Sequence, residues 1–94
     1  MITPNLNLFS TNINDINLFL SKFYSESITE YSNKNCKLYF SDPTKLVSII
    51  SAIIDNNEKY NITAWINLDN DTYIKITENN LDEIIKYIYE RYPY

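Results

Sequence analysis

The sequence predicts a small α+β domain, an antiparallel sheet of about four strands packed with three helices. Three observations lead to this prediction. Apolar residues recur at helical spacing in three segments, and apolar and polar residues alternate between those segments. The chain has 94 residues, of which 45% are hydrophobic and 15% are aromatic, which is enough for a core. We therefore expect residues 1–94 to form one domain.

Each predicted helix begins after residues suited to cap it. The first follows Thr11 or Asn12, the second follows Ser41-Asp42 with Pro43 at its first position, and the third follows Thr77. The apolar stripes are Ile13, Ile16, Phe19, Leu20 and Phe23, then Leu46, Ile49, Ile50, Ile53 and Ile54, then Leu81, Ile84, Ile85, Ile88 and Tyr92.

A hairpin is predicted between the second and third helices, because residues 62–68 and 72–77 both alternate. A three-residue loop, 69–71, places Ile66 opposite Ile74 and Trp65 opposite Lys75. A two-residue loop would mix the apolar and polar faces, since directly opposed residues share a face. We therefore predict the three-residue loop.

The first half of the chain repeats this plan at an offset of 34 or 35 residues. Ile28-Thr29-Glu30-Tyr31 resembles Ile62-Thr63-Ala64-Trp65, and Cys36 to Ser41 follows as the returning strand. This pattern predicts an internal αββ-αββ-α repeat. The alternative is that residues 27–32 extend the first helix. Residues 1–10 are expected to form an edge strand or a loose N-terminal segment.

The missing residue types exclude most chemistry. The chain has no histidine and no glycine, and Arg91 is its only arginine. Histidine is the usual general base and metal ligand, and glycine forms the loops that hold phosphates. The sequence therefore predicts no enzyme, no cofactor and no metal site. Asp69-Asn70-Asp71 is interpreted as a turn and Cys36 as a buried thiol in a reducing cytoplasm. No apolar run is long enough to predict a membrane span.

Strand alternation predicts an aromatic surface on the sheet face that the helices leave open. The predicted members are Trp65, Tyr73, Tyr39, Lys75, Lys37 and Tyr31. Trp and Tyr dominate interface hot spots because they bury a large area and lose few rotamers. The alternative is that the N-terminal segment or a helix covers this face, and that the rings form a second small core.

The leading functional prediction is a non-enzymatic protein-binding module. A net charge of −4 suits a basic partner, such as a nucleic-acid-handling protein, and disfavours duplex DNA. In size and charge the chain is comparable with anti-CRISPR proteins, antitoxins and toxin-immunity proteins of phages or mobile elements. The alternative is a module that binds single-stranded nucleic acid, with bases stacked on the rings. Self-association through the same face is a further alternative.

Overall fold

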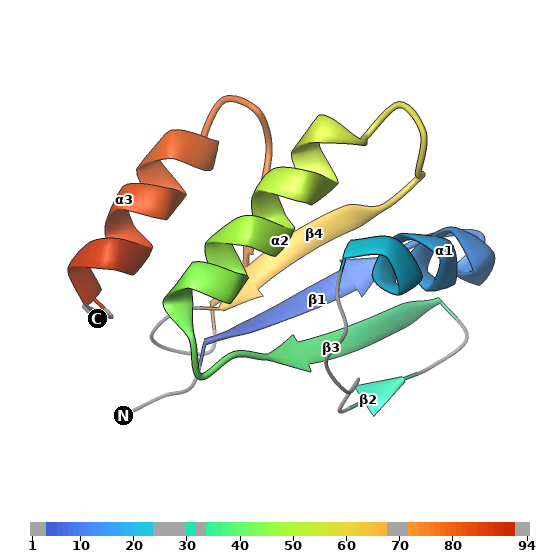
Figure 1. Ribbon diagram of the computed structural model, residues 1–94, viewed down its shortest axis with the longest axis horizontal. Helices are drawn as coiled ribbons and strands as arrows, with labels where there is room; N and C mark the ends of the chain where they lie inside the picture. The colour runs from blue at the N-terminus through green and yellow to red at the C-terminus, as the bar shows by residue number, and fades with distance from the viewer. Residues whose placement is uncertain (1–3, 24–29, 32–33, 68–71, 92–94) are drawn as a thin grey trace.

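The computed structural model describes residues 4–23, 30–31, 34–67 and 72–91, and it confirms the α+β class (Figure 1). In these residues three helices pack with one antiparallel sheet. The strands are β1 (Asn5–Phe9), β2 (Glu30–Tyr31), β3 (Asn35–Tyr39), β4 (Thr63–Asn67) and β5 (Ile74–Lys75). The helices are α1 (Ile13–Phe23), α2 (Pro43–Asp55) and α3 (Leu81–Arg91).

The first strand lies at the centre of the sheet. The strand order is β2-β3-β1-β4-β5, and each neighbouring pair is antiparallel. Leu6 of β1 pairs with Leu38 on one side and with Ile66 on the other. The prediction of an edge strand or a loose segment over residues 1–10 is therefore wrong for Asn5–Phe9. Alternating Asn and Leu side chains fit a central strand that has only one face toward a core.

From β1 to β4 the chain runs β-α-β-β-α-β, the split βαβ or ferredoxin-like connectivity. One unit is β1-α1-β2, with β3 inserted between its strands, and the other is β3-α2-β4, with β1 inserted. The predicted αββ-αββ-α repeat is not confirmed, because the two hairpins enter the sheet differently. In the first hairpin the strand next to β1 is β3, which is the second strand of that hairpin. In the second hairpin the strand next to β1 is β4, which is the first strand of that hairpin. This arrangement hosts many unrelated functions, so it defines a fold and no activity.

The two hairpins test the predicted strand register. In the second hairpin Trp65 pairs with Lys75 and Ile66 with Ile74, as predicted from face sorting. Its loop, 69–71, lies outside the described residues. In the first hairpin the two residues of β2, Glu30 and Tyr31, pair with β3. The alternative of an extended first helix is therefore wrong at those two residues.

Side-chain caps begin two of the helices, α1 and α2. Asn12 caps α1 and Asp42 caps α2, and each Oδ1 accepts from the backbone N–H two residues later, at 3.1 and 2.8 Å. The predicted cap of the third helix, Thr77, is wrong. Asn80 precedes α3, and its carbonyl oxygen accepts from the N–H four residues later at 3.0 Å. The Asn80 Oδ1 also accepts from the Thr77 N–H at 2.8 Å, so a turn separates β5 from the helix.

One face of the sheet shares a single core with all three helices. Leu6 and Leu8 of β1 are fully buried in the middle of this core. The other strand residues of this face are Cys36, Leu38, Ala64 and Ile66, and the helices add Ile16, Phe19, Leu46, Ile50, Ile84 and Ile88. Figure 1 shows α1, α2 and α3 on the same side of the sheet. The described helices therefore leave the other side of the sheet without a helix against it.

Candidate binding surface

The second face of the sheet is not covered by the described helices, which all pack on the first. We call this second face the open face. Its described members are the strand residues that alternate with the core residues, namely Asn5, Asn7, Phe9, Asn35, Lys37, Tyr39, Thr63, Trp65, Asn67 and Lys75. Directly opposed residues share a face, so Lys37, Asn7, Trp65 and Lys75 form one row across four strands.

Three aromatic rings on the open face are partly exposed to solvent. Phe9 is 39% exposed, and Tyr39 and Trp65 are each 37% exposed. They belong to β1, β3 and β4, which are adjacent in the sheet. Asn7 lies between them, because it pairs with Trp65 and is two residues from Phe9 on the same strand. The open face therefore has an aromatic rim around a polar centre.

Tyr73 reaches the open face from the side of β5. Its hydroxyl donates a hydrogen bond to the Oδ1 of Asn5 at 2.8 Å. Asn5 is on β1, and β4 lies between β1 and β5. The Tyr73 side chain must therefore cross β4, where Asn67 is the residue paired with Asn5. This crossing explains why Asn67 is only 8% exposed on a face without a helix.

Two amide oxygens at the polar centre are buried without a hydrogen-bond partner. They are the Oδ1 atoms of Asn7 and Asn67. A buried polar atom left unsatisfied costs about 1–3 kcal/mol, and such atoms are rare in native proteins. Asn5, in the same patch, differs because Tyr73 satisfies its oxygen. Sequence reasoning missed this amide centre, although the Asn-Leu-Asn-Leu alternation of residues 5–8 was the available signal.

The structure brings together five of the six predicted binding residues. Trp65, Tyr39, Lys37 and Lys75 share the open face, and Tyr73 reaches it through Asn5. The side chain of Tyr31 lies outside the described ones, so its place on this surface stays a prediction. In the strand register Tyr31 pairs with Cys36.

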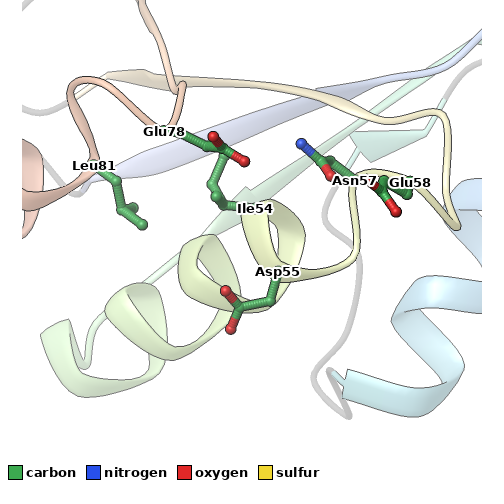
Figure 2. A pocket seen from close by; sticks show the side chains of 6 residues that line it. All are labelled: Ile54, Asp55, Asn57, Glu58, Glu78 and Leu81. Atoms are coloured by element: carbon green, nitrogen blue, oxygen red, sulfur yellow. The ribbon is translucent and has the colours of Figure 1, made fainter.

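A separate depression of about 530 Å³ lies between the end of α2 and the start of α3 (Figure 2). Its lining residues are Ile54, Asp55, Asn57, Glu58, Glu78 and Leu81. Figure 2 shows the three carboxylates spread around Ile54 without converging on one point. Among the described residues no group of three or more His, Cys, Asp or Glu could hold a metal ion. The depression therefore contributes negative charge to the helix side of the molecule.

The chemistry of the remaining candidate groups is limited. Burial raises the pKa of the Cys36 thiol from 9.0 to about 11, so the thiol is protonated at neutral pH. A protonated, buried thiol is a poor nucleophile, and Cys36 acts as a core residue. The Asp69-Asn70-Asp71 turn prediction lies outside the described residues.

Comparison with other proteins assigns no family to this fold and surface. No protein-family model matches the chain, and neither the curated proteins nor the solved structures gave a match. In the part of the chain that the structure describes, no helix has the length and hydropathy of a membrane span.

Proposed function

We propose that the chain is a non-enzymatic binding module and that the open face is its binding surface. The exposed ring of Trp65, with Phe9 and Tyr39 on neighbouring strands, is the observation that supports this most. Exposed aromatic side chains on adjacent strands of a sheet face that no described helix covers are typical of interaction sites. The polar centre beside these rings holds the buried amide oxygens of Asn7 and Asn67, which have no hydrogen-bond donor.

A protein is the first partner class that we propose. Trp65 and Tyr39 combine a large apolar ring with a polar atom, as hot-spot residues do. The carboxylates of α2, α3 and their flanking turns (Asp55, Glu58, Glu78, Asp82 and Glu83) give a negative field that would speed the approach of a basic partner. An acidic inhibitor, antitoxin or immunity-type protein in the cytoplasm would have these properties.

Substitution of Trp65 tests the binding surface. Affinity capture from a host lysate, with identification by mass spectrometry, should recover the partner with the wild-type chain and lose it with Trp65→Ala. The expected loss of affinity is roughly 30-fold or more, as for a central hot spot. Tyr89→Ala is the matched control, because Tyr89 is an exposed ring on α3, away from the open face. Equal recovery with a Trp65→Ala chain that has the wild-type circular dichroism spectrum would remove the open face from the proposal.

Single-stranded nucleic acid is a second candidate, and the local charge of the open face favours it. Among the described side chains of this face the charged ones are Lys37 and Lys75, although the net charge of the chain is −4. Electrostatic screening acts over about 8 Å at physiological salt, which is short beside a molecule whose smallest extent is 23 Å. Local charge therefore counts for more than net charge. Aromatic rings beside lysines suit stacked bases and their phosphates.

A further inference from the structure

We propose that an apolar groove on the helix side of the molecule binds a short segment of another protein, one in which an apolar side chain is flanked by lysine or arginine. The groove lies between the end of α2, the strands β4 and β5, and the start of α3. Its apolar lining residues belong to the core that the helices share with the sheet, or pack against that core. The proposal is therefore independent of the function proposed for the open face.

The bottom of the groove is apolar. Beside the depression of about 530 Å³ lies a smaller one of about 200 Å³, and the two have Ile54 and Glu78 in common. The apolar residues that line the smaller depression are Ile53, Ile54, Ile62, Ala64 and Ile76. A cavity of about 150 Å³ can hold a benzene molecule, so the smaller depression has room for one leucine or isoleucine side chain.

Carboxylates surround this apolar lining. Asp55, Glu58 and Glu78 line the larger depression, and all three are exposed. Within the residues that the structure describes, none of these carboxylates forms a salt bridge. Lys59 follows Glu58 in the sequence, but its ammonium lies over the Tyr60 ring, 5.5 Å from the ring centroid. Charge complementarity therefore favours a cationic partner.

Lys75 is a cationic residue in the lining of the smaller depression. Alternation along β5 places its side chain on the open face, because Lys75 pairs directly with Trp65. The groove is therefore lined by the backbone of Lys75, and its ammonium does not oppose a cationic ligand there.

The end of α2 adds to the negative potential of the groove. The C-terminal end of a helix carries a partial negative charge, so cationic side chains are favourable there and carboxylates are unfavourable. α1 and α3 follow this rule, with Lys22 and Arg91 in their last turns. α2 has no basic residue in its last turn and ends on Asp55. This end of α2 is therefore electrostatically unfavourable in the free chain, and a cationic partner would relieve it.

The positions of the carboxylates favour an extended partner. Figure 2 shows Asp55, Glu58 and Glu78 at separate points around Ile54. A metal ion needs ligands that converge, and in the described residues no three His, Cys, Asp or Glu side chains gather to hold one. A chain segment can place cationic side chains against separate carboxylates while its apolar side chain enters the smaller depression. A second copy of this chain is disfavoured, because each copy has a net charge of −4.

Selection from a displayed library of random heptapeptides tests the chemistry of the occupant. With the wild-type chain as bait, we expect enriched peptides that carry leucine, isoleucine or valine within two positions of lysine or arginine. Replacing the apolar residue of the consensus peptide by serine should weaken binding by about tenfold or more, the factor for burying one such side chain. No enrichment, or enrichment of peptides without a basic residue, would overturn the proposal.

Charge variants locate the consensus peptide on the chain. Glu58→Gln combined with Glu78→Gln should weaken it roughly three- to tenfold in fluorescence anisotropy, the effect of two exposed charge pairs. Glu90→Gln is the matched control, because Glu90 is an exposed carboxylate near the end of α3 and outside the groove. Trp65→Ala should also leave the peptide bound, which separates the groove from the open face. Equal affinity of the double variant and the wild type would overturn the assignment of the groove.

Asp55→Asn gives a second measurement that a purely structural carboxylate would not pass. The substitution removes a charge that opposes the helix dipole, so we expect the urea midpoint of the free chain to rise. The same variant should bind the consensus peptide about twofold more weakly, since it loses one exposed charge pair. A fall in the urea midpoint would show that Asp55 stabilises the free chain and would overturn the electrostatic argument for a cationic partner.

Discussion

The two faces of this sheet differ in how far the described residues bury them and satisfy their hydrogen bonds. On the covered face Leu6 and Leu8 of β1 pair with apolar residues on both sides and are fully buried by the helices. On the open face the alternate residues of the same strand lie among partly exposed rings, and Asn7 has an oxygen without a donor. One central strand therefore serves both the core and the candidate binding surface, and its unsatisfied amide oxygen lies on the open face.

Leu8→Ala is the substitution with the largest expected effect, and it tests the division between the faces. Leu8 has no exposed surface and lies at the centre of the core, so we expect the free energy of unfolding to fall by about 3–5 kcal/mol. Phe9→Ala, at the next residue, removes an open-face ring that already contacts solvent. We expect it to lower the free energy of unfolding by less than about 1.5 kcal/mol. Urea unfolding followed by circular dichroism measures both, and equal losses would contradict the assignment of the faces.

A smaller contrast lies within the open face, between a satisfied amide and an unsatisfied one. Tyr73→Phe leaves the Asn5 oxygen without its donor, so we expect the free energy of unfolding to fall by about 1–2 kcal/mol. Asn67→Leu removes an oxygen that has no partner, so the free energy of unfolding should stay the same or rise by up to about 1 kcal/mol. Thermal and urea unfolding of both variants check this. A similar loss of unfolding free energy in the two variants would mean that the Asn67 oxygen already has a hydrogen-bond donor, for instance an ordered water.

Much of the fold could be predicted because its signals are local. Asp42 and Pro43 mark the start of α2 within two residues, and the alternation around Trp65 and Ile66 determines the register of the second hairpin. The central position of β1 could not be predicted in this way. It depends on pairing between Leu6 and Ile66, which are far apart in the sequence. No local pattern around either residue indicates that the two pair.

The same limit applies to the candidate site. Trp65 and Lys75 were predictable together, because they belong to one hairpin. The polar centre at Asn7 was not predictable with them, since Asn7 comes next to Trp65 only through the pairing of β1 with β4. The pairing of Tyr31 with Cys36 was not predictable either, because β2 has two residues and offers too little alternation to determine its register. The hydrogen bond from Tyr73 to Asn5 crosses a third strand, and no sequence pattern indicates such a contact.

The smallest expected effect concerns the covered face and its thiol. Burial raises the pKa of Cys36 from 9.0 to about 11, so the folded chain holds this proton more tightly than the unfolded chain. The resulting stabilisation is present in full below about pH 9 and is lost as the pH rises through about 11. The Cys36→Ala variant lacks this pH-dependent stabilisation but keeps every other titrating group. The difference in free energy of unfolding between the wild type and Cys36→Ala should therefore narrow between pH 8 and pH 10.5, and urea midpoints at the two pH values measure it. A difference that does not change with pH would show that water reaches the thiol and that the covered face is less tightly closed than its burial indicates.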